Sequence, residues 1–174
     1  MKRHIRTRAV IVTAAALVTA GAVTVGVSQA EPAHQAKPAK AKSAKATKAT
    51  IAALFDGWND ALQTGDAEKV ADRYAPDAVL LPTASPKIRT DRAEIVDYFE
   101  HFLLKKPSGE KIRSVINVLD SNSAIDAGIY EFHLTDPKTG EKKELEARYT
   151  YEYEKRGGEW LIVNHHSSVL PAEG

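Results

Sequence analysis

The spacing of apolar residues changes once along this chain, after Pro107-Ser108-Gly109, and this change constrains the fold more than any other feature. Before that point, apolar residues recur every three or four positions, which is typical of amphipathic helices. After it, apolar and polar residues alternate, which is typical of strands buried on one face. Helices followed by long strands predict an α+β fold in which the helices cover one face of a curved antiparallel sheet.

Three helices are expected in the first part. The first helix can end at Gly65, the second can be capped by Asp66, and the third starts at Thr90 or Asp91 with Glu94 placed as in a capping box. The apolar face of the first helix consists of Ile51, Leu54, Phe55, Trp58 and Leu62. Four strands are expected after residue 110, namely 111–119, 124–134, 144–154 and 160–170, separated by sequences rich in Asp, Asn, Pro and Gly.

The N-terminal segment differs from the rest of the chain. Residues 1–30 combine a basic start, an apolar stretch over 9–27 and small residues at Ser28 and Ala30, which predicts a signal peptide cleaved after Ala30. The apolar stretch approaches the length of a membrane span, so an uncleaved membrane anchor is the alternative. We therefore expect a secreted or extracytoplasmic protein.

Residues 31–50 are rich in Lys, Ala and Pro and contain no bulky apolar side chain, which predicts a disordered linker. Its lysines could also bind anionic cell-surface material. No apolar anchors recur at helical spacing there, so calmodulin binding is not expected. The folded domain is expected to span residues 51–171, followed by a tail at 172–174. The chain has no cysteine, which excludes disulfides and a cysteine nucleophile.

Several segments of the domain resemble a known superfamily. They are Gly65-Asp66, residues 74–82, residues 98–100 and the closing basic-Gly-Gly-x-Trp-x-Ile-Val-x-His-His pattern of residues 155–168. They are similar to the nuclear transport factor 2-like superfamily. Within it, the match is closest to the association (hub) domain of calcium/calmodulin-dependent protein kinase II and to bacterial secreted relatives, the SgcJ/EcaC-like proteins. The resemblance implies a cone-shaped fold with three N-terminal helices and a homo-oligomer. It implies no kinase activity, because the kinase signature motifs are absent.

The resemblance also implies a pocket on the side of the sheet that carries Tyr151, with Tyr130, His165 and Ser167 pointing into it. Animal hub domains have arginines that hold small carboxylates at the positions of Tyr130, Tyr151 and Ser167, and this chain has none. Tyrosines with a histidine and a serine could instead bind a small organic ligand. They could equally form the core of the sheet, where alternating tyrosines meet across strands.

A proton-transfer group in this pocket would indicate an enzyme. Asp126 shares the strand parity of Tyr130, and Asp126 and His165 are weak catalytic candidates. A buried aspartate beside tyrosines is how ketosteroid isomerase-like members abstract a proton, although Asp126 could be solvated. The alternative to a binding protein is therefore a cofactor-independent isomerase, cyclase or polyketide-tailoring enzyme of the same fold. A purely structural surface protein is a third class.

No cofactor and no metal are expected. His165 and His166 are adjacent on a strand and point to opposite faces, so they cannot bind one metal. Asp97 and His101 share a helix face, where an exposed side-chain pair is the commoner outcome. His165 is the only pocket group expected to change charge near neutral pH, so affinity for an acidic ligand should rise below about pH 6.5.

The second face of the sheet predicts self-association. Strand alternation places Trp160 and Ile162 opposite the pocket-facing Leu161 and Val163, and it places Arg148 and His166 on the face away from the pocket. An open sheet that is apolar on both faces needs a cover beyond its own helices. At least a dimer is therefore expected.

Overall fold

The computed structural model describes residues 46–83 and 85–172, and it confirms the expected α+β class. The predicted signal peptide, residues 31–45 of the predicted linker and residues 173–174 lie outside the described residues. In chain order the elements are α1 (Lys48–Gln63), α2 (Ala67–Ala71), β1 (Tyr74–Leu81), α3 (Arg92–Phe102), the short 3₁₀ helix η1 (Leu103–Lys105), β2 (Ser108–Val118), β3 (Ser123–Thr135), β4 (Lys142–Arg156) and β5 (Glu159–Val169). Among the described residues, no helix has the length and apolar character needed to cross a membrane.

The helices begin where the sequence provides capping side chains. Thr47 caps α1, so the helix starts at Lys48 and includes the last three residues of the predicted linker, 31–50. Asp66 caps α2 through Glu68 N and Lys69 N. Asp91 caps α3 by accepting from Glu94 N at 2.9 Å, and the Glu94 carboxylate accepts from Thr90 N at 3.0 Å. This arrangement satisfies backbone donors at both sides of the helix start, as in a capping box.

The five strands form one curved sheet in the order β1-β5-β4-β3-β2. Strands β2 to β5 are antiparallel neighbours, as expected, whereas β1 pairs in parallel with β5. The sequence pattern did not predict β1. Val70, Ala71 and Tyr74 have the spacing of a helix face, which predicts that the second helix continues to Tyr74, and the apolar run after Pro76 is short. The sheet is therefore mixed rather than purely antiparallel.

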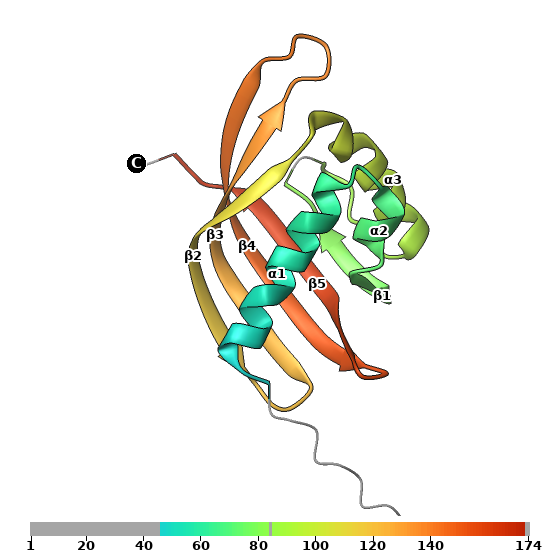
Figure 1. Cartoon of the computed structure of the whole chain (residues 1–174), viewed down its shortest axis with the longest axis vertical. Helices are drawn as coiled ribbons and strands as arrows, with labels where there is room; N and C mark the ends of the chain where they lie inside the picture. Colours follow the sequence, from blue (N-terminus) through green and yellow to red (C-terminus); the bar gives the residue numbers. More distant parts are fainter. Residues whose placement is uncertain (1–45, 84, 173–174) are drawn as a thin grey trace, which may run out of the picture. The chain divides into compact units, whose positions relative to one another are not determined.

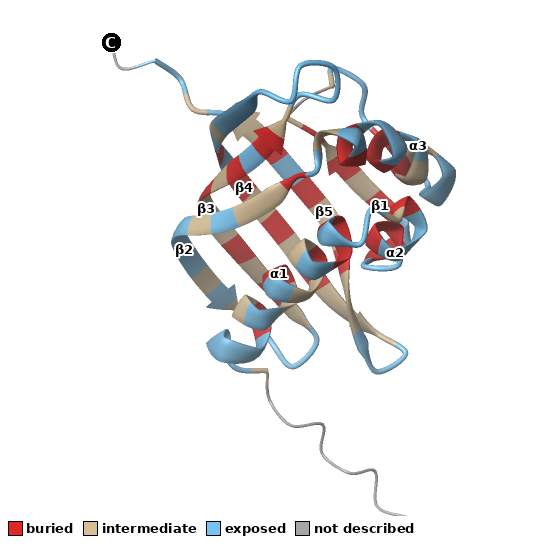
Figure 2. Ribbon diagram, turned by 45° about the horizontal axis from the view of Figure 1, so that its top comes forward, coloured by how far each residue is buried: buried red, intermediate tan, exposed pale blue. Residues whose placement is uncertain are grey.

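All helices lie on one side of the sheet, where α1 crosses it and α2 and α3 lie beside β1 (Figure 1). Buried residues follow the strands beneath the helices (Figure 2). The core between the two layers is mainly aromatic: Trp58 of α1 meets Phe99, Phe132 and Tyr151 with ring centroids 5.7–6.3 Å apart. Offset and edge-on pairs of this kind add to the stabilisation from buried area.

A β-bulge in β5 changes which side chains face the core. Glu152 pairs with Asn164, but the next residue, Tyr153, pairs with Ile162, so Val163 is the extra residue. Ile162 is consequently 2% exposed and belongs to the core. The prediction that Ile162 lies on the outer face, with Leu161 and Val163 facing the pocket, was wrong because it assumed unbroken alternation.

Candidate functional site

A small closed cavity lies between α3, the segment after β1 and the sheet. Its volume is about 20 Å³, which is room for about one water molecule. Three of the four predicted ligand-binding residues, Tyr130, His165 and Ser167, line it together with Thr83 and aromatic side chains of α3. The fourth, Tyr151, is fully buried and stacks on His165 with ring centroids 4.1 Å apart. An organic ligand would require the surrounding rings to move.

A chain of hydrogen bonds fixes His165. The indole Nε1 of Trp58 donates to the Tyr74 hydroxyl oxygen at 3.1 Å, and this hydroxyl lies 2.9 Å from His165 Nδ1. The Tyr74 oxygen accepts a hydrogen bond from Trp58, and Nδ1 is the one remaining described partner to which its own hydrogen can be donated; the hydrogen-bond network therefore assigns the histidine hydrogen to Nε2. Nε2 is buried and has no partner among the described residues. His165 thus offers an unused N–H donor at the cavity.

His165 stays neutral at physiological pH. Burial lowers the pKa of His165 to about 3, and the neighbouring His166 contributes to the same direction. The expectation that His165 gains charge near pH 6.5 was therefore wrong, because a fully buried imidazole cannot be hydrated when it is charged. Burial also raises the pKa values of Tyr130 and Tyr74. The cavity is consequently a neutral polar site.

A second set of hydroxyl groups lies at the same cavity. The Tyr130 hydroxyl donates to Ser167 Oγ at 2.5 Å, and Ser167 Oγ also contacts the Thr83 hydroxyl. Thr83, Tyr74 and Trp58 were not predicted as site residues, because their contacts depend on how β1 meets β5.

The outer-face residues Arg148 and His166 are exposed.

Asp126 does not line this cavity. It lies in one row of the sheet with Tyr151 and His165, so Tyr151 separates the two weak catalytic candidates. The carboxylate is fully buried and accepts from Lys111 Nζ at 2.8 Å, from Ser114 Oγ at 2.5 Å and from the Tyr149 hydroxyl at 3.1 Å. These contacts make Asp126 the centre of a buried polar network between β2, β3 and β4.

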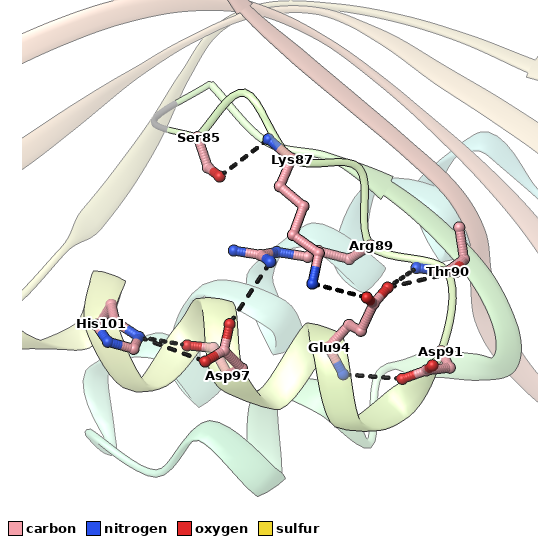
Figure 3. Close-up of polar contacts among 8 residues, drawn as sticks. All are labelled: Ser85, Lys87, Arg89, Thr90, Asp91, Glu94, Asp97 and His101. Atoms are coloured by element: carbon pink, nitrogen blue, oxygen red, sulfur yellow. Dashed lines mark hydrogen bonds and ion pairs between the residues drawn. The ribbon is translucent and has the colours of Figure 1, made fainter.

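Two further groups bear on metal binding. His101 Nδ1 lies 2.7 Å from the Asp97 carbonyl oxygen and 3.9 Å from its carboxylate (Figure 3), so this pair is a local helix contact. Glu131, His133 and Glu144 form the only described cluster whose potential ligand atoms lie within 4.8 Å of one another. Glu131 and His133 are two residues apart on the outer face, and Glu144 faces His133 from β4. This cluster was not predicted from the sequence.

With the geometry established, comparison with known proteins identifies the family. The sequence model of the calcium/calmodulin dependent protein kinase II association domain matches residues 47–171. The chain belongs to this family. A crystallised domain from Xanthomonas campestris, assigned to the same association-domain family, is 55% identical over 74% of this chain and 91% of that chain, with a TM-score of 0.71. No curated protein matches the sequence.

More distant structures share the fold of this association domain. A nuclear transport factor 2-like protein from Salmonella enterica is 16% identical over 71% of this chain and 91% of that chain, with a TM-score of 0.62. The association domain of the Caenorhabditis elegans kinase is 14% identical over 70% of this chain and 95% of that chain, with a TM-score of 0.57. The resemblance to the association domain and the nuclear transport factor 2-like cone fold, both drawn from the sequence, are thereby confirmed.

Proposed function

We propose that this association domain is an exported protein that assembles with copies of itself through the sheet face opposite the helices. The observation that carries the proposal is the uncovered outer face of the sheet. All described helices pack on the other face (Figure 1), and the outer-face residue Val115 is 49% exposed although its side chain is apolar. The name of the family, which refers to association, supports the same function.

The outer face combines apolar and charged side chains in a way that suits a subunit interface. Ala127 lies between Val115 of β2 and Thr150 of β4 in one row. In the next row, Ile129 lies between Arg113 and Arg148. An apolar centre bordered by charged groups is the usual arrangement of a contact surface between proteins.

The position of Ile129 allows a sharp test. In Ile129→Glu, the new carboxylate lies between two arginines, so a single subunit can accommodate it. A symmetric interface would bury the glutamates and oppose assembly. The matched control is Leu104→Glu, because Leu104 is 61% exposed and belongs to η1, away from the sheet. Mass would be measured by light scattering and native mass spectrometry at tens of micromolar.

We expect the wild type and Leu104→Glu to be at least dimeric and Ile129→Glu to be monomeric while keeping its circular dichroism spectrum. A monomeric wild type would reject self-association. An unchanged assembly of a folded Ile129→Glu variant would place the interface elsewhere.

The cavity at His165 carries a second part of the proposal, namely binding of a small neutral molecule, which requires the surrounding rings to move because the cavity itself has room for about one water molecule. The unused His165 Nε2–H can donate to an acceptor, and the neutral imidazole gives no charge to attract an acid. Native mass spectrometry of the wild type and of His165→Phe tests this part. A retained small molecule lost in the variant supports it, and identical spectra without added mass oppose it. A small-molecule enzyme would need a proton-transfer group at this cavity, and Asp126 is directed elsewhere.

A further inference from the structure

A second hollow lies next to the closed cavity, on the side of α3 that faces the loop before it. Its volume is about 240 Å³. The hollow is lined by Ser85, Arg89, Tyr98, His101, Phe102 and Lys105. Tyr98 and Phe102 also line the closed cavity, so their stacked rings, with centroids 5.6 Å apart, form a wall shared by both spaces.

Arg89 is the central group of this hollow. Its backbone forms two hydrogen bonds of 2.9 Å with Leu80 of β1, which fix its position. Only 10% of its side chain is exposed, and the guanidinium carbon lies 5.9 Å from the centre of the Tyr98 ring. Figure 3 shows the guanidinium extending between Ser85 and the Asp97–His101 stretch of α3.

The buried charge of Arg89 is incompletely paired. One terminal nitrogen lies 3.5 Å from the Asp97 carboxylate, which is itself 54% exposed, and Nε has no partner among the described residues. A buried guanidinium is costly unless its N–H groups are all satisfied. Arg89 Nε–H therefore lacks a hydrogen-bond acceptor among the described residues.

A further charged group of the hollow is also positive. Lys105 contributes a second permanent cation, whereas His101 Nδ1 already donates to the carbonyl oxygen of Asp97, whose carboxylate is half exposed. Lys87 is nearby but is paired with Glu94 at 2.8 Å, so its charge is already neutralised (Figure 3). An anion in the hollow would balance the excess charge and complete the hydrogen bonding of Arg89.

We propose that this hollow, the Arg89 groove, binds the anionic group of a small molecule with a flat apolar body, either a carboxylate or a phosphate monoester. Arginine forms paired hydrogen bonds with both groups. The rings of Tyr98 and Phe102 provide the apolar surface that an aromatic body requires. This inference does not depend on self-association or on the cavity at His165.

The test is isothermal titration calorimetry of the full chain at constant ionic strength with three probes: benzoate, phenyl phosphate and inorganic phosphate. We expect one site per chain for benzoate, phenyl phosphate or both, and at least about 10-fold weaker binding of inorganic phosphate, because that probe lacks the apolar body. Binding of benzoate alone identifies a carboxylate site, and binding of phenyl phosphate alone identifies a phosphate site.

Three variants locate the binding. Arg89→Gln should weaken binding by about 10-fold or more, since it removes a charge-assisted pair. Arg92→Gln is the matched control, because Arg92 has the same charge and follows Arg89 by three residues, at the start of α3, but pairs with Glu68 and Asp72 away from the groove. The double variant His101→Gln and Lys105→Gln should weaken binding about 3-fold or more.

The double variant also provides a test that does not depend on the folding of Arg89→Gln. Arg89 is buried, so circular dichroism must show that Arg89→Gln is folded; if it is not, the double variant alone decides. The proposal is overturned if neither aromatic probe binds at millimolar concentration. It is also overturned if Arg92→Gln weakens binding as much as the groove variants, since binding would then follow net charge. It is equally overturned if the folded groove variants leave binding unchanged, since the Lys-rich residues 31–50 would then account for the heat.

Discussion

Replacing Asp126 with asparagine tests the buried polar network most directly. The change keeps the shape of the side chain and removes its charge. Lys111 then loses its carboxylate partner at 2.8 Å while only 16% of its side chain is exposed. Ser114 and Tyr149 also lose their charged acceptor.

The expected cost follows from the geometry. Removing one partner of a buried ion pair destabilises a protein by about 3–5 kcal/mol. Lys111 keeps a hydrogen bond of 3.2 Å to the Ala52 carbonyl oxygen and lies 4.8 Å from the centre of the Phe55 ring, so part of its charge stays compensated. We therefore expect about 3 kcal/mol, which corresponds to a decrease in Tm of about 10 °C for a domain of this size.

The assay is urea unfolding at pH 7 and fixed protein concentration, because assembly would make stability depend on concentration. The double variant Asp126→Leu with Lys111→Met removes both charges and should recover most of the loss, because no unpaired charge is left buried. A value for Asp126→Asn within about 1 kcal/mol of wild type would refute the reasoning, since that is the range of an exposed pair.

Three further predictions concern other parts of the chain. Gly128→Ala should lower the free energy of unfolding by at least about 2 kcal/mol, since a Cβ there would overlap the Arg113 carbonyl oxygen, whereas Gly57→Ala inside α1 should raise it by about 0.5–1 kcal/mol; urea unfolding of both variants checks this. The pKa of His165 is about 3 when folded and 6.5 ordinarily, so only the unfolded chain gains this proton as pH falls from 6.5. The free energy of unfolding should therefore decrease as the pH decreases, by up to about 1.4 kcal/mol per pH unit. Unfolding measured between pH 6.5 and 5 should show this contribution in the wild type and not in His165→Gln. N-terminal sequencing of exported protein should begin at Glu31, and a start at Met1 would support an uncleaved anchor instead.

Local patterns predicted most of the fold. The three helices and four long strands could be predicted because caps such as Asp66 and Asp91, and turn residues between the strands, act over a few positions. Strand β1 could not, because its only strand partner among the described elements is β5, about 85 residues later in the chain. A short segment whose structure depends on such a distant partner carries little local signal.

The candidate site was predicted in part for the same reason. Alternation along β3 and β5 correctly placed Tyr130, His165 and Ser167 at one cavity. Alternation could not reveal how deeply His165 is buried, so the low pKa of its imidazole was not predicted. It also missed Arg89, which is buried by its pairing with Leu80 rather than by any pattern in its own neighbourhood.

The parallel pairing of β1 with β5 also affects the order in which the chain can fold. Strand β5 is the last element, so the edge that holds β1 and its neighbouring helices does not exist until residues 159–169 have been synthesised. During synthesis, the N-terminal half therefore has exposed apolar helices without a sheet to cover. The edge formed by β1 can therefore be completed only in a late step of folding, after the final strand has emerged.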